Sequence, residues 1–361
     1  MRKFKPAACL AAAVMMILSL GHMSPAAQGS QTDLLPDSVK SNARQTSYYA
    51  YIPDHSIYFV DAGEDFAWAY RAIDYLAGGG VVSGVGDHLF APGKPITRAD
   101  FMVMLYRAYD MSDYSRMATF SDVPEDAYYA EAVGAAETLG IAAGSSGRFS
   151  PEEQVTREDA VVFLKRTLDL TGLHFAPGSL NGFTDAEQIS DYAAGAVAAL
   201  TGAGVISGGA DDVFNPDTAI TRAEMAALLY RALHLTEKGV YVHQPDLVNL
   251  CIGDTVYTDV RIVGYEPDES YKGLVRCLTF YEKEEGYFIE LGGAEEINQQ
   301  VIYEDGSLIV DGQAMAVSSD VVCVNVSPYS TLEAPVSTGE YYQSARVALL
   351  GELVTEIYYQ A

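Results

Sequence analysis

The feature that most constrains this chain is one pattern repeated three times between Phe59 and Leu235. Each copy begins with Phe-x-Asp, continues with Gly-apolar-x-x-Gly, and ends with Phe-x-Pro followed by Thr-Arg. Self-similarity of this kind marks a repeat architecture, in which one unit cannot bury its own apolar face. The sequence therefore predicts three related units that share one core.

Each unit is expected to contain two helices around a glycine turn. Apolar residues recur at helical spacing before the turn and after the threonine. The glycine that ends each first helix has the position of a helix C-cap glycine. The predicted core stripes of the first helices are Ala69/Ile73/Leu76, Ala132/Ala136/Leu139 and Ala193/Val197/Leu200, followed by Gly80, Gly140 and Gly204. Those of the second helices are Phe101/Leu105/Ala108, Ala160/Leu164/Leu168 and Met225/Leu228/Leu229/Ala232.

Each second helix is expected to begin at a threonine that caps its N-terminus. An acidic residue three positions later completes a capping box, in which the hydroxyl and the carboxylate each accept one backbone N–H. Glu224 fits this box best, because aspartate has the shorter side chain. The threonine–acid pairs are Thr97 and Asp100, Thr156 and Asp159, and Thr221 and Glu224.

Capping does not explain the arginine that follows each threonine: Arg98, Arg157 and Arg222. A cation at the positive end of a helix dipole is unfavourable by roughly 0.3–1 kcal/mol. One explanation is an ion pair with an acidic neighbour on another repeat. The other is an anion site made of a guanidinium and free helix N–H groups, and we favour this second hypothesis.

Taken together, these elements resemble S-layer homology repeats. The third copy, Ile220-Thr-Arg-Ala-Glu224, carries the hallmark of that family intact. The resemblance implies three helix-loop-helix repeats in a pseudo-threefold helical bundle. It also implies an exported protein held non-covalently on a bacterial cell wall by an anionic secondary cell-wall polysaccharide, often one that carries ketal-pyruvate.

The resemblance further implies a set of ligand-binding residues. The three arginines would contact the polymer carboxylate beside the capping threonines, and small glycines would let a sugar approach the backbone. Trp68 either stacks on a sugar or is a half-buried helix residue. The aspartates of Phe-x-Asp either bind a sugar hydroxyl or cap the first helices. The glycines are Gly84, Gly144 and Gly208, and the aspartates are Asp61, Asp122 and Asp185.

The second copy departs from the pattern at Glu158, which directly follows Arg157. We expect this extra carboxylate to weaken the Arg157 site for an anion. The mechanism implied by three related sites is multivalent capture, in which several weak sites on one frame gain avidity. We also expect Arg222→Ala to reduce wall binding while leaving thermal stability almost unchanged.

The residues outside the repeats set the domain organisation. Residues 1–27 read as a signal peptide, with Arg2 and Lys3 before an apolar run too short to span a bilayer; a retained anchor helix is the alternative. The expected segments are a flexible leader over 28–57, repeats over 58–117, 118–180 and 181–237, and a C-terminal domain over 240–361.

That C-terminal segment is rich in Val, Tyr and Ile and alternates over 256–263 and 321–326. Asp305-Gly306 and Gly351-Glu352 mark two hairpin turns. We predict a small antiparallel β domain, barrel or sandwich, of six to eight strands. Its cysteines, Cys251, Cys277 and Cys323, lie in apolar contexts and are expected to be buried free thiols rather than a disulfide and one spare.

Charge and motifs limit the function. With 22 basic and 49 acidic residues the formal net charge is -27, which disfavours nucleic acids and anionic membranes as partners. His243 has no metal-spaced partner, and acids such as Glu282, Glu284 and Glu285 read as a solvated edge. We expect no catalytic residue, no metal and no cofactor. The leading hypothesis is a wall-anchored surface protein, and the alternatives are a wall-acting enzyme with the same anchor or a protein–protein interaction module.

Overall fold

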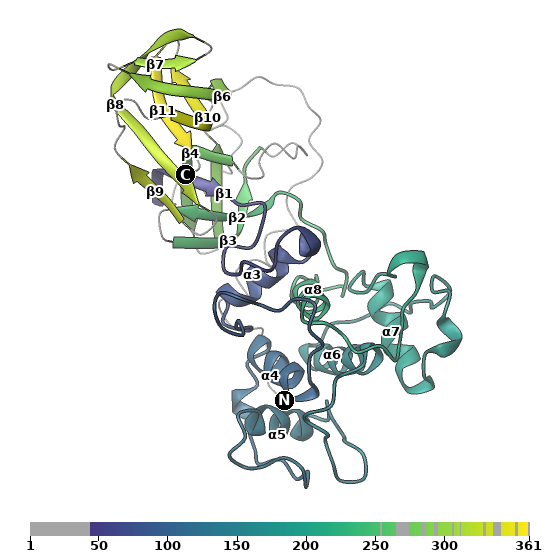
Figure 1. Cartoon of the computed structure of the whole chain (residues 1–361). Helices are drawn as coiled ribbons and strands as arrows, with labels where there is room; N and C mark the ends of the chain where they lie inside the picture. Colours follow the sequence, from purple (N-terminus) through teal and green to yellow (C-terminus); the bar gives the residue numbers. More distant parts are fainter. Residues whose placement is uncertain are drawn as a thin grey trace. The chain divides into compact units, whose positions relative to one another are not determined.

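The computed structural model describes residues 44–252, 255–264, 274–283, 286–291, 295–304, 307–310, 312–327, 330–334, 341–350 and 353–359. The predicted signal peptide lies outside these residues. The chain divides into two compact units, one over Phe59–Gln244 and one built from the segments before and after it (Figure 1). In the part of the chain that the structure describes, no helix combines the length and the apolarity needed to cross a membrane.

We call the unit over Phe59–Gln244, which holds all three repeats, the repeat unit. Within the described residues it contains six α-helices, two in each repeat. The first helices are α3 (Tyr70–Gly78), α5 (Ala130–Thr138) and α7 (Asp191–Gly202), and the second helices are α4 (Arg98–Ala108), α6 (Arg157–Thr171) and α8 (Arg222–Leu233). Short 3-10 helices lie at Glu64–Phe66, Ser112–Tyr114, Ala186–Gln188 and Ala210–Asp212. The predicted apolar stripes are buried, except that Leu139 is only partly so.

The threonines cap the second helices as predicted. The Oγ1 atoms of Thr97, Thr156 and Thr221 accept the backbone N–H three residues on, at 3.1, 3.2 and 3.3 Å. The capping box is complete at Thr221, whose own N–H donates to Glu224 Oε2 at 2.8 Å. The box thus forms at the copy with the longer acid, as expected.

The glycine turns are also confirmed. Gly204 has a φ of 76°, in the left-handed region that glycine enters without a Cβ penalty. Its N–H donates to Thr201 O and the next N–H, of Val205, donates to Leu200 O, both at 3.0 Å. This is the Schellman arrangement that satisfies carbonyls at a helix C-terminus, and Gly80 and Gly140 repeat it.

The repeats are joined in a cycle. Each first helix packs on the second helix of the preceding repeat, α5 on α4, α7 on α6 and α3 on α8, and the three second helices contact one another (Figure 1). Backbone bonds run the same way, from Arg98 N to Glu153 O, Arg157 N to Thr218 O and Arg222 N to Lys94 O, at 2.9, 2.9 and 3.0 Å. Each repeat therefore completes its packing with parts of another.

The aspartates of Phe-x-Asp do not cap the first helices. Asp185 instead accepts the backbone N–H groups of Phe214 and Asn215, at 2.8 and 2.7 Å. Asn215 has a φ of 58°, so the carboxylate fixes a left-handed residue in the Phe-x-Pro loop. The other copies repeat this clasp, Asp61 on Phe90 and Ala91, and Asp122 on Phe149 and Ser150.

The second unit contains two sheets. In the first, β1 (Arg44–Ile52) pairs with β2 (Leu247–Ile252) and β4 (Leu274–Lys283), β2 with β3 (Thr255–Ile262), and β5 (Gly286–Leu291) with β3 and β4. The second sheet runs β11 (Leu353–Tyr359), β10 (Tyr341–Leu350), β6 (Glu295–Glu304), β7 (Ser307–Val310), β8 (Gln313–Ser327), β9 (Ser330–Ala334), with a further β11–β8 pairing. The first sheet encloses an apolar cluster that includes Leu250, Val260 and Phe280.

The prediction of a flexible leader over 28–57 is wrong for its second half. Strand β1 pairs with β4 along its whole length, from Arg44 opposite Glu282 to Ile52 opposite Leu274. Its polar, tyrosine-rich sequence lacks a clear period, and its hydrogen-bonding partners lie far away in the sequence. A strand supported by such distant neighbours is poorly visible in local propensity.

The predicted C-terminal β domain is present and contains two sheets, but its strands are not all antiparallel. β3 and β5 pair in parallel, as do β8 and β11. Both predicted hairpins pair antiparallel, with Glu304 opposite Ser307 and Leu350 opposite Leu353, while the turn residues themselves lie outside the described residues. Cys251 and Cys323 are buried free thiols, as expected; the side chain of Cys277 is outside the description.

The glycine of the second turn offers a test of this packing. A Cβ at Gly144 would lie 2.5 Å from Arg148 O and from a ring carbon of Phe120, whereas one at Gly147 would meet nothing within 4 Å. Both residues have positive φ, so both alanine variants carry a backbone penalty of about 1 kcal/mol. We expect Gly144→Ala to cost about 1–3 kcal/mol more than Gly147→Ala.

Urea unfolding followed by tryptophan fluorescence measures this difference, because the chain's single tryptophan, Trp68, lies in the repeat unit. Equal urea midpoints for the two variants would show that the space beside Gly144 accepts a Cβ without extra cost.

Candidate functional site

The arginines of the Thr-Arg motif reach across repeat boundaries. Each guanidinium lies over the Phe-x-Pro phenylalanine ring of the next repeat, which is a favourable cation–π geometry. The distances to the ring centroids are 5.2 Å for Arg98 over Phe149, 5.4 Å for Arg157 over Phe214 and 4.4 Å for Arg222 over Phe90. The three equivalent arginines differ, however, in their polar contacts.

Arg222 is buried and donates to two backbone carbonyls, an arrangement that we call the Arg222 brace. The residue is 7% exposed, and its Nε and Nη2 atoms donate to Phe90 O and Ser83 O, both at 2.7 Å. Desolvation lowers its pKa, against the opposing effect of nearby Asp100 and Asp61. These contacts argue against the expectation that this side chain can be removed without loss of stability, since two carbonyls would lose their donor.

Arg98 is held by an ion pair. Its Nη1 atom lies 2.5 Å from Asp159 Oδ2, and its Nε donates to Phe149 O at 3.0 Å. A second ring, Phe163, lies 5.1 Å from the guanidinium. The ion pair with another repeat, the alternative to an anion site, is thus present here.

Arg157 is held more loosely. Its Nη1 atom lies 3.3 Å from Glu224 Oε1, and its side chain is 21% exposed against 14% for Arg98. Its Nε is buried and has no hydrogen-bond partner among the described residues, although the equivalent atoms of Arg98 and Arg222 donate to carbonyls. Desolvation lowers its pKa more than the Glu224 charge raises it. A buried donor without an acceptor is uncommon and calls for an explanation.

A cavity of about 280 Å³ adjoins this arginine. We call it the Arg157 pocket, and all three repeats contribute to it: Trp68 from the first, Arg157 from the second, and Gly208, Glu224 and Arg231 from the third. Its walls come from α6, α8 and the turn that follows α7. Four residues that the sequence singled out, Trp68, Arg157, Gly208 and Glu224, thus meet in one place.

The position of Trp68 is occupied by tyrosine in the other repeats. Tyr128 and Tyr192 stand at the same spacing before Gly140 and Gly204 as Trp68 does before Gly80, and all three are exposed, by 70%, 57% and 57%. Tyr128 Oη donates to Asp100 at 2.7 Å, and Tyr192 Oη donates to Asp159 at 2.9 Å. Burial and these carboxylates raise the pKa of both tyrosines.

The sequence analysis missed these tyrosines, although aligning the three copies on their helix-ending glycines places them directly. Comparison of the three repeats shows that the side chains at this position make different contacts. At Tyr128 and Tyr192 a hydroxyl bridges to the acid of the adjacent second helix. An indole has no hydroxyl, and Trp68 instead lines the Arg157 pocket.

The extra carboxylate of the second copy contacts the third repeat. Glu158 is buried and accepts hydrogen bonds from Ser190 N at 3.0 Å, Ser190 Oγ at 2.9 Å and Tyr192 Oη at 2.8 Å. These bonds do not support the expectation that Glu158 weakens the Arg157 site. The carboxylate that pairs with Arg157 is Glu224.

The glycines proposed for sugar contact have a reason inside the chain. A Cβ at Gly84 would lie 2.7 Å from Leu89 O, one at Gly144 2.5 Å from Arg148 O, and one at Gly208 2.9 Å from the Asp212 Cα. Close approach of the backbone to itself therefore suffices to require glycine. Gly208 also lines the Arg157 pocket, and the role of the other two in ligand binding stays a prediction.

Comparison with known proteins identifies the repeats. A family model described as S-layer homology domain matches residues 59–102, 119–161 and 182–226. The chain therefore carries three S-layer homology domains. Among the described residues, no group of three or more His, Cys, Asp or Glu side chains is arranged to hold a metal ion.

Several relatives share this region. The amylopullulanase of Thermoanaerobacterium thermosulfurigenes is 32% identical over 57% of this chain and 11% of its own length. Exoglucanase XynX of Acetivibrio thermocellus is 33% identical over 49% and 16%, and the surface-layer 125 kDa protein of Lysinibacillus sphaericus is 28% identical over 50% and 15%. The chain thus spans less than a fifth of the length of these relatives. The domain type and the surface-layer relative point to the cell surface or cell wall.

The brace formed by Arg222 predicts a stability effect. We expect Arg222→Ala to lower the free energy of unfolding of the repeat unit by about 2–4 kcal/mol, because two carbonyls lose their donor. Arg107→Ala, which removes an exposed arginine from α4, is the matched control and should change it by no more than about 0.5 kcal/mol. Urea unfolding by Trp68 fluorescence measures both, and similar midpoints would contradict the brace.

The Asp185 clasp predicts an acid sensitivity. Burial alone would raise the pKa of this carboxyl, but the N–H groups of Phe214 and Asn215 outweigh burial and hold the pKa below its usual value of 3.8. A lowered folded-state pKa contributes stability above the unfolded value, and this contribution is lost as pH falls through the folded value. We expect Asp185→Asn to be less stable at pH 7 and to lose less stability on acidification.

The exposed Asp217→Asn is the control for this pH series. The free energies of unfolding of both variants and the parent are compared from pH 7 to about pH 2. An Asp185→Asn curve parallel to that of the parent would rule out the proposed linkage.

Proposed function

We propose that the chain is held non-covalently at a bacterial cell wall, where its S-layer homology domains bind an anionic secondary wall polysaccharide. The three domain matches and the surface-layer relative support this proposal. The predicted signal peptide over residues 1–27 supplies the export that such a location needs. A pseudo-threefold helical frame is part of the proposal, supported by the cyclic order of the contacts between repeats.

The observation that carries the proposal is that Arg157 is buried and its Nε has no hydrogen-bond acceptor among the described residues. A buried Nε without an acceptor costs about 1–3 kcal/mol, and burial also disfavours the charged guanidinium. A ligand carboxylate or ketal-pyruvate group in the adjoining pocket would supply acceptors and charge at the same time. Charge-assisted hydrogen bonds of this kind are roughly twice as strong as neutral ones.

The charge balance of the pocket favours an anion. Its lining holds two arginines, Arg157 and Arg231, against one carboxylate, Glu224. The chain as a whole carries a formal charge of -27 and repels a polyanion at long range. Recognition must therefore be local, with the guanidinium groups binding the charge and the exposed face of Trp68 available for sugar stacking.

We further propose that the three domains do not contribute equally. At the equivalent positions, Asp159 pairs with Arg98, and Tyr128 and Tyr192 bridge to neighbouring acids. A ligand at either position would have to displace a charged or bridging contact. The Arg157 pocket is accordingly the main site, rather than one of three equal sites.

For the β unit we propose display at the surface without catalysis. The glycoside-acting relatives match this chain only over the repeat region, so their names carry no argument for the strands. Release of reducing sugar from wall glycans by the full chain would favour the enzyme alternative instead.

Co-sedimentation of the full chain with walls of an S-layer-bearing Gram-positive bacterium, stripped of protein, tests the main proposal. We expect Arg157→Gln to weaken binding by about 10- to 100-fold, corresponding to the loss of roughly 1.5–3 kcal/mol. Arg107→Gln removes the same charge from an exposed site and should bind as the parent does.

Chemical removal of the non-peptidoglycan glycan from the walls should abolish binding by the parent chain. Binding that survives this treatment would overturn the polysaccharide as ligand. Failure to bind the stripped walls, with binding restored by extracted surface proteins, would favour the protein–protein alternative.

A further inference from the structure

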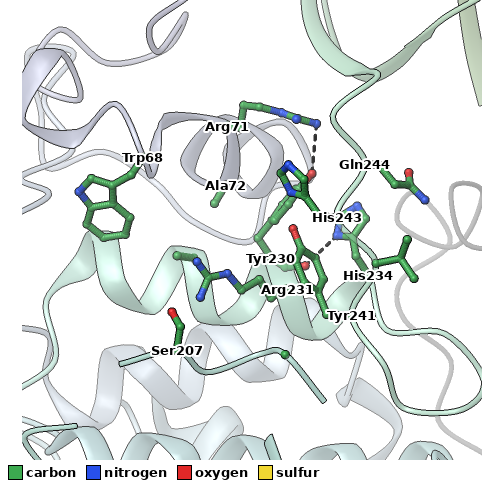
Figure 2. A pocket seen from close by; sticks show the side chains of 13 residues that line it. Trp68, Arg71, Ala72, Ser207, Tyr230, Arg231, His234, Tyr241, His243 and Gln244 are labelled. Carbon is green, nitrogen blue, oxygen red and sulfur yellow. Dashed lines mark hydrogen bonds between the residues drawn. The ribbon is translucent and has the colours of Figure 1, made fainter. Parts of the chain in front are cut away.

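A second cavity, of about 350 Å³, lies beside the Arg157 pocket in the repeat unit. We call it the Arg71 pocket. Its basic and tyrosine lining includes Arg71 on α3, Arg231 on α8, His234 at the C-terminal end of α8, and Tyr241 and His243 on the segment that follows. Figure 2 shows these side chains gathered around it with Trp68.

The lining of this pocket is basic in an acidic protein. It contains two arginines and two histidines and no aspartate or glutamate. The chain as a whole has 22 basic and 49 acidic residues, so a cavity without a carboxylate runs against the composition. Low-dielectric walls lined by one sign of charge concentrate ligands of the opposite sign.

The walls of the pocket are held in place by contacts within the chain. Arg71 Nη2 donates to Tyr230 Oη at 3.3 Å, and His234 Nδ1 lies 2.7 Å from Tyr230 O (Figure 2). The His234 ring also packs 4.2 Å from the Tyr230 ring, centroid to centroid. The backbone N–H of Tyr241 donates to Ala203 O at 2.7 Å, which ties the following segment to the turn after α7.

The two pockets adjoin each other. Both are lined by Trp68, Ser207, Ala227 and Arg231. Trp68, which is exposed, and Arg231, whose Nη1 donates to Val205 O at 3.3 Å, therefore border both cavities. A ligand that extends past Trp68 can therefore contact the lining of both cavities.

Much of the Arg71 pocket lies outside the domain pattern. The last family match ends at residue 226, whereas Arg231, His234, Tyr241 and His243 follow it. The pocket is thus assembled when the segment after the third repeat returns to the helices. This makes it a property of this chain rather than of the matched domain alone.

We propose that the Arg71 pocket is a second anionic subsite for the same polymer chain, so that one oligosaccharide with two acidic groups spans both pockets around Trp68. One acidic group binds at Arg157 and the other among Arg71, Arg231 and His243. The sugar between them faces the Trp68 indole. This inference rests on the proposed function, because it assigns the same ligand to a longer site.

Competition between stripped walls and soluble polymer fragments tests this length, using the full chain. The fragments are released from the same walls and separated into those with one and those with two acidic groups. We expect the two-acid fragments to compete at least 10-fold better than the one-acid fragments with the parent chain. His243→Glu, at an exposed position of the pocket lining, should abolish most of this advantage.

Arg71→Gln should do the same, and thermal unfolding shows whether it folds. His174→Glu introduces the same charge at an exposed histidine that lines neither pocket and should keep the advantage. An equal advantage in the parent, His243→Glu and Arg71→Gln, or no advantage in the parent, would overturn the second subsite.

The two proposals fail in different ways. Should the parent chain not bind the stripped walls, the proposed function falls, and the subsite falls with it. Should Arg157→Gln weaken wall binding while His243→Glu and Arg71→Gln leave the fragment advantage intact, the proposed function stands and only the second subsite is wrong.

Discussion

The repeat unit depends on an arginine that crosses each repeat boundary and lies on a phenylalanine of the next repeat. At the first position of a helix a cation is disfavoured by the helix dipole, so the contact must offset that cost. Arg98 and Arg222 do so with a ring beneath the guanidinium and a carbonyl that accepts from Nε. Each first helix also packs on the second helix of the preceding repeat, so these arginine contacts join parts that cannot form a core alone.

Local features of this fold are predictable from the sequence, and contacts between distant residues are not. Helix periodicity, the Thr221–Glu224 box and the Schellman turn at Gly204 involve residues within one or two helical turns, and all three were predicted. For Asp185 the sequence suggests either a helix cap or a sugar contact, because its partners in the structure are backbone groups 29 and 30 residues later. Strand β1 was missed for the same reason. Its partner strand β4 follows all three repeats in the sequence, and no local periodicity indicates such a partner.

The candidate site follows the same division. Repetition of the motif singled out Arg157 and Gly208 together with their counterparts in the other copies, and Trp68 was singled out as the only tryptophan. The sequence analysis, however, expected the Arg157 site to be the one weakened, by Glu158. The structure separates the copies through the acids and tyrosines around each arginine. Arg231 recurs as Arg107 and Arg166, ten residues after each capping threonine, but the sequence analysis considered only the arginine next to the threonine. Arg71 belongs to no repeated motif, and only packing brings α3 and α8 together.

The asymmetry has a physical consequence for binding. A guanidinium that already donates to carbonyls or a close carboxylate, as in Arg222 and Arg98, gains little when an anion arrives, because old bonds are exchanged for new ones. Arg157 keeps an unsatisfied buried donor and a longer ion pair, so an anion there adds contacts without replacing many. In a protein whose overall charge repels a polyanion, affinity must come from such unsatisfied places. Under the proposed function, the stability given up at this repeat boundary is the source of recognition there.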